Sequence, residues 1–170
     1  MTVRIGINGF GRIGRSVLRA ALTNDADVQV VAVNDLTDAR TLATLLEWDS
    51  TSGHLDGVGV DGDTITVQGR SITAFAQPDP SAIPWGDVGV DVVIESTGRF
   101  TDGAKAADHL KGGARKVIIS APAKGDVPTF VLGVNDDTLD PNSHDVFSNG
   151  SCTTNSLAPL AKVLNDEFGI

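Results

Sequence analysis

The sequence contains one cysteine, Cys152, among its 170 residues. No disulfide can form within the chain, so a reducing compartment is expected and the protein is predicted to be cytoplasmic. Histidine is almost as scarce, since His54, His109 and His144 are the three present and lie far apart in the sequence. We interpret all three as surface or packing residues. We predict no metal site, because a structural zinc ion needs clustered nitrogen or sulfur ligands.

Positive charge is also scarce, since 13 lysine and arginine residues stand against 22 aspartate and glutamate residues and the net charge is −9. Without a basic stripe to neutralise phosphates, nucleic acid is not an expected partner. No apolar run approaches the roughly 18–20 residues of a membrane span, so no membrane association is expected. Residues 1–7 lead directly into a strand-like run with no secretory signal pattern. The apolar fraction of 41% indicates one soluble globular domain with a real core.

Segments of β and α character alternate along the chain. Strands are predicted at 3–7, 28–33, 91–95, 116–119, 129–134 and 145–147. Helices are predicted around 13–22 with an end at 24–27, around 38–46, over 101–110 with an end at Gly112-Gly113, and from 152 onward. Alternating strands and helices imply right-handed crossovers. The predicted fold is therefore a Rossmann-type, doubly wound α/β domain with a parallel sheet.

Two of these helices have apolar residues on one face. The apolar residues at helical spacing are Ile13, Val17, Leu18, Ala21 and Leu22 in the first helix and Leu42, Leu45 and Leu46 in the second. The expected N-cap of the second helix is Thr37 or Asp38. Between residues 50 and 76 the pattern changes to short β-branched runs separated by Gly62-Asp63 and Gln68-Gly69. This region is predicted to be an antiparallel β-meander inserted into the parallel scheme.

The turn after the first strand has the spacing of a dinucleotide-binding motif, with Gly9, Gly11 and Gly14 in the order GxGxxG. Asp35 ends the second strand, where an acid can accept hydrogen bonds from the adenosine ribose. Glycine lets the backbone approach a pyrophosphate, and the helix N-terminus that follows faces the anion. The carboxylate of Asp35 would repel a 2′-phosphate, so NAD is favoured over NADP. The alternative is a glycine-rich turn that binds no ligand.

Cys152 lies in a polar stretch at the expected start of the last helix. The unpaired N–H groups and dipole of a helix N-terminus favour the thiolate form of a cysteine there. The same N–H groups can stabilise an oxyanion on a carbon that sulfur has attacked. A buried, inert cysteine is the alternative, and the five polar residues around Cys152 argue against it.

The segments Asn8–Arg15 (NGFGRIGR) and Ser151–Asn155 (SCTTN) together resemble the glyceraldehyde-3-phosphate dehydrogenase family. The resemblance runs in order over essentially the whole chain, through VNDL at 33–36, ESTG at 95–98 and SAPAK at 120–124. It implies a phosphorylating, NAD-dependent dehydrogenase of glycolysis that assembles as a homotetramer. Two positions depart from the family pattern, because Gly150 replaces a usual alanine and Pro78 replaces a common arginine near the adenosine.

The resemblance also implies residue roles. NAD would be held by Gly9, Gly11, Arg12, Ile13, Gly14, Asp35, Thr97, Gly98 and Ser120. Cys152 would be the nucleophile, and Ser151 and Thr153 would contact the substrate, glyceraldehyde 3-phosphate, or the inorganic phosphate that attacks later. The thiolate would add to the aldehyde, hydride would pass to the nicotinamide, and phosphate would cleave the thioester to give 1,3-bisphosphoglycerate.

By the same resemblance, residues 1–150 form an NAD-binding Rossmann domain and residues 151–170 form the first helix of a truncated catalytic domain. The family's base histidine would follow Ile170, so this chain alone is expected to be inactive. Two alternatives stay open. An erythrose-4-phosphate dehydrogenase shares these motifs, and a non-catalytic NAD-binding module would fit the length of 170 residues.

Overall fold

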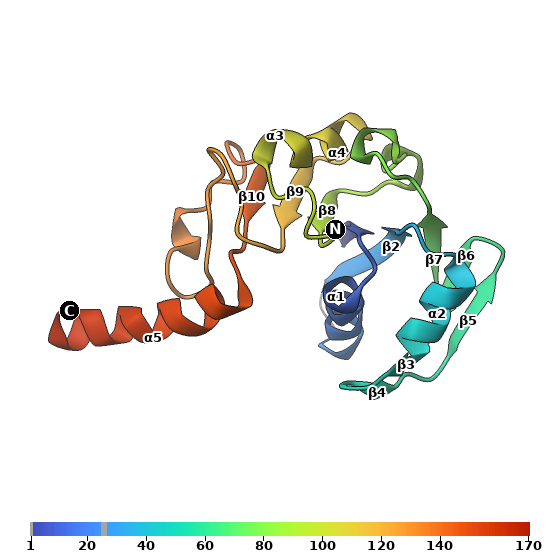
Figure 1. The fold of residues 1–170 in the computed structure, drawn as a ribbon, viewed down its shortest axis with the longest axis horizontal. Coiled ribbons are helices and arrows are strands. Elements are labelled where there is room, and N and C mark those ends of the chain that lie inside the picture. Colours follow the sequence, from blue (N-terminus) through green and yellow to red (C-terminus); the bar gives the residue numbers. More distant parts are fainter. Residues whose placement is uncertain (1, 25–26) are drawn as a thin grey trace.

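The computed structural model describes residues 2–24 and 27–170, and its centre is a sheet of 8 strands in the order β10-β9-β8-β1-β2-β7-β6-β5 (Figure 1). The parallel strands that follow one another across it are β10 (Val146–Ser148), β9 (Lys116–Ile119), β8 (Val92–Glu95), β1 (Val3–Asn8) and β2 (Val28–Asn34). This arrangement confirms the predicted Rossmann-type, doubly wound α/β fold. The chain reverses its direction of winding between β1 and β8, and ligands of such folds bind at that point.

Helices cover both faces of this sheet (Figure 1). They are α1 (Arg12–Thr23), α2 (Ala39–Glu47), α3 (Gly103–Ala106) and α4 (Asp108–Lys111), with short 3-10 turns at Pro80–Ala82, Gly86–Val88 and Asp136–Thr138. The last helix, α5 (Cys152–Phe168), covers neither face and projects from the sheet. In Figure 1, α1 and α2 lie on one side of the sheet and α3 and α4 lie on the other. The predicted end of the first helix at 24–27 includes residues 25–26, which lie outside the described residues. No helix in the described part is long and apolar enough to cross a membrane.

The predicted β-meander is confirmed as β5 (Val58–Asp61), β6 (Thr64–Val67) and β7 (Arg70–Phe75), which pair antiparallel in sequence order. It extends the main sheet, because β7 also pairs in parallel with β2. The turns use positive φ angles at Gly62 (54°), Gln68 (49°) and Gly69 (78°). A small hairpin of β3 (Trp48–Asp49) and β4 (Gly53–His54), which the sequence pattern did not predict, precedes the meander.

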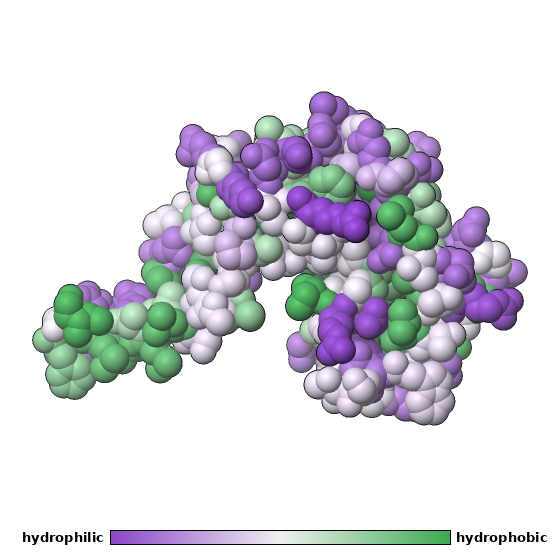
Figure 2. All heavy atoms as spheres, in the orientation of Figure 1, coloured by the Kyte–Doolittle hydropathy of each residue, from purple (hydrophilic) through white to green (hydrophobic). Residues whose placement is uncertain are grey.

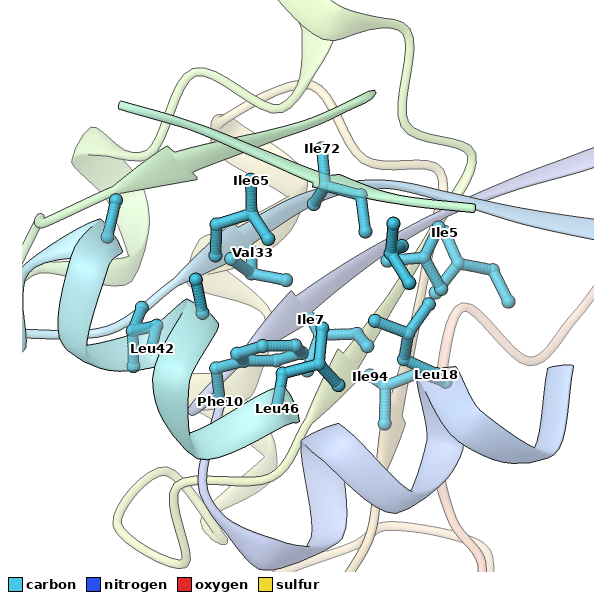
Figure 3. Close-up of a cluster of buried hydrophobic side chains, with 14 residues drawn as sticks. Ile5, Ile7, Phe10, Leu18, Val33, Leu42, Leu46, Ile65, Ile72 and Ile94 are labelled. Atoms are coloured by element: carbon cyan, nitrogen blue, oxygen red, sulfur yellow. The ribbon is translucent and has the colours of Figure 1, made fainter. Parts of the chain in front are cut away.

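The larger core cluster lies between the sheet and the pair α1 and α2 (Figure 3). Leu18 projects into it from α1, and Leu42 and Leu46 project from α2, as predicted. The prediction was wrong for Leu45, which is 41% exposed because it is turned about 100° from Leu46 around the helix axis. Ile13 is 54% exposed, since it lies in the first turn of α1, beyond the edge of the core.

The predicted helix over 101–110 is instead divided into α3 and α4. Asp102 caps α3 through the N–H groups of Ala104 and Lys105. At Ala107 the chain tightens, and the Leu110 N–H donates to the Ala107 carbonyl at 3.0 Å, three residues back. The predicted end at Gly112-Gly113 is confirmed, with Gly113 at a φ of 103°.

The predicted strand over 129–134 is wrong. Thr129 forms only an isolated bridge with Ser148, after which the chain turns. The Val131 N–H, which a strand would use for pairing, donates to the side chain of Asn135 at 2.8 Å. Gly133 takes a φ of 76°, which ends any extended run there.

Leu46 and Leu45 offer a matched test of this packing. We expect Leu46→Ala to lower the free energy of unfolding by about 2–5 kcal/mol, because it leaves a cavity in the core. Leu45→Ala should lower it by no more than about 1 kcal/mol, because its side chain is partly solvated already. Urea unfolding followed by circular dichroism measures both variants, and equal losses would contradict the packing of α2 described above.

Candidate functional site

The turn between β1 and α1 lies directly against the end of β8. Gly9 has a φ of 89°, and a Cβ atom on it would lie 2.7 Å from the Thr97 backbone nitrogen. The Ser96 hydroxyl donates to the Gly9 carbonyl at 2.7 Å and fastens the turn to β8. Glycine is therefore required at position 9 for both the conformation and the close approach.

The N-terminus of α1 is open. Its N-cap, Gly11, has no side chain to accept from the helix, and a Cβ atom there would meet nothing within 4 Å. The first intrahelical bond runs from the Arg15 N–H to the Gly11 carbonyl at 3.0 Å. The N–H groups of Arg12, Ile13 and Gly14 therefore have no intrahelical acceptor, and they form a ready site for an anion.

Gly14 has a different task from Gly11. It is buried, and a Cβ atom on it would lie 2.4 Å from the Gly9 carbonyl oxygen and 2.8 Å from a methyl group of Ile7. The absence of a side chain at position 14 lets α1 pack closely onto β1. The helix N-terminus is thereby held beside the turn.

Asp35 follows β2 and faces the same turn. Its carboxylate accepts from the Phe10 N–H at 2.9 Å and from the Thr37 N–H at 3.2 Å. These bonds hold the carboxylate beside the turn, and Asp35 remains partly exposed. A ligand hydroxyl can reach it there.

A cleft of about 350 Å³ opens over the carboxyl ends of β2, β1 and β8. Of the residues predicted for a dinucleotide, it is lined by Gly9, Gly11, Asp35 and Thr97. Pro78, one of the two departures from the family pattern, also lines it. Arg12, Gly14 and Gly98 are neighbours of these residues in sequence but do not line the cleft.

Cys152 is the first residue of α5 and is exposed. The N-cap is Ser151, whose hydroxyl accepts from the Thr154 N–H at 2.9 Å. The same hydroxyl lies 2.9 Å from the Thr153 hydroxyl. The N–H groups of Cys152 and Thr153 precede the first intrahelical bond of α5, so they face outward beside the thiol.

A second cleft, of about 500 Å³, contains the thiol. Three of the predicted residues line it: Ile13, Ser120 and Cys152. Gly11 lines the first cleft and Ile13 lines the second, so the two clefts lie on either side of the N-terminus of α1. The structure thus brings the two sequence motifs to the same helix end.

Gly150, the other departure from the family pattern, precedes this helix with a φ of 72°. Its N–H donates to the Ser148 hydroxyl at 2.9 Å. Glycine adopts this left-handed conformation without the strain that alanine would have.

Sequence reasoning missed a buried polar group beneath the first cleft. Asn8, Asn34 and Glu95 end three neighbouring strands and are each no more than 4% exposed. The available signal was polar residues at the ends of apolar strands. His109 joins them and is fully buried, in agreement with a packing role, whereas His54 and His144 are more accessible. Within the described residues, no group of three or more His, Cys, Asp or Glu side chains could hold a metal ion.

Comparison with known proteins identifies the same family that the sequence motifs resemble. The family described as "Glyceraldehyde 3-phosphate dehydrogenase, NAD binding domain" matches residues 3–103. The whole chain is 60% identical to the glyceraldehyde-3-phosphate dehydrogenase of Geobacillus stearothermophilus and to glyceraldehyde-3-phosphate dehydrogenase 1 of Bacillus subtilis (strain 168). It covers 51% of each, so the chain spans about half the length of these relatives.

The two helix-end glycines should respond differently to a methyl group. Gly14→Ala forces a contact with backbone, and we expect it to lower the free energy of unfolding by about 1–3 kcal/mol. Gly11→Ala should change it by less than about 0.5 kcal/mol, because the space there is open. Thermal or urea unfolding of the two variants checks this. A Gly11→Ala loss as large as that of Gly14→Ala would contradict the geometry of the turn.

Proposed function

The chain belongs to the glyceraldehyde-3-phosphate dehydrogenase family, and we propose that it is the coenzyme-binding half of a phosphorylating, NAD-dependent member. One observation carries the proposal. The glycine-rich cleft and the Cys152 cleft lie on either side of the same helix N-terminus. A coenzyme extended across that helix end would bring its reactive ring toward the thiol.

The residues of the first cleft fit a dinucleotide. Gly9 and Gly11 leave room for the backbone to approach a pyrophosphate, and the N–H groups of Arg12, Ile13 and Gly14 would bind it. Asp35 would accept from the adenosine ribose. Thr97 and Gly98 would border the coenzyme on the side of β8, and Ser120 would do so near the thiol. When bound, NAD supplies the hydride acceptor for the oxidation.

Cys152 would carry the substrate. Its sulfur forms a bond to the aldehyde carbon of glyceraldehyde 3-phosphate, and the first-turn N–H groups of α5 stabilise the oxygen that gains charge. After oxidation the sulfur holds the acyl group as a thioester. Inorganic phosphate then forms a bond to the acyl carbon, the C–S bond breaks, and 1,3-bisphosphoglycerate leaves. Ser151 and Thr153 present hydroxyl groups beside the thiol that suit a phosphate oxygen.

The reaction also needs a base to take the hydroxyl proton of the sulfur adduct. No described histidine lines the Cys152 cleft. The His109 ring is hydrogen-bonded to Trp85 and Glu95, and the His54 ring lies beside the carboxylates of Glu47 and Asp56. We therefore propose that the base comes from the other half of the complete subunit and that this chain alone does not turn over substrate.

We propose that the chain divides at the start of α5. Residues 1–150 would form the coenzyme domain, and 151–170 would belong to the catalytic domain. No residue of α5 is buried, and Leu157, Leu164 and Phe168 are between 50% and 80% exposed. Figure 2 shows this apolar surface on the helix that projects from the sheet. We propose that the catalytic half covers it in a complete, cytoplasmic, homotetrameric enzyme.

Binding of NAD tests the proposal directly. The chain should bind NAD, and Gly11→Ala should weaken the affinity about tenfold or more, because its methyl group occupies the space of the pyrophosphate. Isothermal titration calorimetry measures this, with Ala20→Val, at an exposed position of the same helix, as the matched control. The control should bind like the parent chain.

NADP is the comparison ligand in the same titration. Its 2′-phosphate would lie beside the Asp35 carboxylate, and neither Leu36 nor Thr37 supplies a positive charge to neutralise it. NADP should therefore bind at least about tenfold more weakly than NAD. No NAD binding, or full affinity in Gly11→Ala, would rule out the proposed site.

A further inference from the structure

The buried polar side chains of the described residues are concentrated under the first cleft. They are Asn8, Asn34, Glu95, His109 and Ser148. All except Ser148 belong to one continuous hydrogen-bonded network that crosses the ends of β2, β1 and β8. Uncompensated polar groups are costly in a core, so a network of this extent has to be satisfied at every atom.

One arm of the network fixes the tautomer of His109. The indole N–H of Trp85 can only donate, and it points at His109 Nδ1 at 3.0 Å. Nδ1 must therefore be the acceptor and Nε2 must carry the proton. That proton is donated to Glu95 Oε2, which lies 3.0 Å away.

The other arm comes from the opposite side of the cleft. The Gln77 N–H donates to Asn34 Oδ1 at 2.8 Å, and Asn34 Nδ2 donates to Asn8 Oδ1 at 2.8 Å. Asn8 Nδ2 then donates to Glu95 Oε2 at 2.6 Å. Both arms therefore end as donors on the same carboxylate.

The remaining oxygen of Glu95 holds Thr97. Oε1 accepts from the Thr97 N–H at 2.8 Å and from its hydroxyl at 2.5 Å. The same hydroxyl accepts from the Arg99 N–H at 3.0 Å, which shapes the turn after β8. An ionised carboxylate offers only acceptors, so the four donors on Glu95 match it completely.

Four residues of the network also line the cleft. Asn8, Asn34, Gln77 and Thr97 line the cleft, while Glu95, His109 and Trp85 lie beneath it. We propose that Glu95, oriented by His109, is a positioning residue that sets the floor of the coenzyme cleft and couples it to Trp85. This inference rests on the proposed function, in which that cleft binds NAD.

Glu95→Gln is the decisive variant. An amide keeps the shape of the side chain but presents an N–H₂ group where all partners are donors, so one arm or Thr97 loses its acceptor. We expect NAD affinity to fall about tenfold or more. Val93→Ala is the matched control, because Val93 is fully buried in the same strand but lies outside the network. It should lose stability and keep its affinity for NAD.

His109 supplies a rescue test. In His109→Leu the Trp85 N–H loses its acceptor and Glu95 loses one of its four donors, so the affinity for NAD should fall. In His109→Gln the amide oxygen can accept from Trp85 and the amide nitrogen can donate to Glu95, so affinity should return to within about threefold of the parent chain. If His109 only filled space, His109→Leu would bind NAD more tightly than His109→Gln, because leucine is the apolar substitute.

The indole N–H signal of Trp85 in ¹⁵N NMR spectra reports the coupling. NAD should shift it in the parent chain and not in Glu95→Gln, while the exposed Trp48 serves as internal reference. Parent-like affinity in Glu95→Gln, or an unmoved Trp85 signal in NAD-bound parent chain, would overturn the inference and leave the proposed function standing. Failure of the parent chain to bind NAD would remove the proposed function, and the inference with it.

Discussion

The arrangement of the whole site depends on one close contact, that between the Gly9 backbone and the end of β8. No side chain can be accommodated there, since a Cβ atom would lie 2.7 Å from the Thr97 nitrogen. Because the turn can approach so closely, the Ser96 hydroxyl reaches the Gly9 carbonyl, and α1 starts directly at the switch point of the sheet. The position of that helix end decides where an anion can bind.

The parallel sheet explains why two motifs that are far apart in the sequence lie close together. The glycine-rich turn is close to the start of the chain and Cys152 is near its end, yet both open onto the N-terminus of α1. Parallel strands bring their carboxyl ends to one edge, so residues that follow β1, β8 and β10 meet there regardless of their separation in sequence. Beneath this edge, the carboxylate of Glu95 accepts from both sides of the cleft and joins its floor into one unit.

Local patterns predicted much of this fold. The strand and helix alternation, the meander and the glycine-rich turn depend on spacing within short segments, and the structure confirms them. The expected strand at 129–134 failed for a local reason that no strand pattern takes into account, because the side chain of Asn135 accepts from the Val131 N–H. The network on Glu95 was beyond prediction for a different reason, because it joins residues distant in sequence: Trp85 and His109 are 24 residues apart, and their hydrogen bond depends on how the helix layer packs. Asp35 and Cys152 could be proposed from the sequence, because their roles depend on the end of a strand and the start of a helix.

The central claim is that the open N-terminus of α1, between the two clefts, binds the pyrophosphate of a dinucleotide. Backbone amide NMR of the ¹⁵N-labelled chain during an NAD titration tests it most directly. The account predicts that the N–H signals of Gly11, Arg12 and Ile13 move furthest, with saturation at the same NAD concentration as the signal of Thr97. Saturable NAD binding that leaves those three amide signals in place would contradict it.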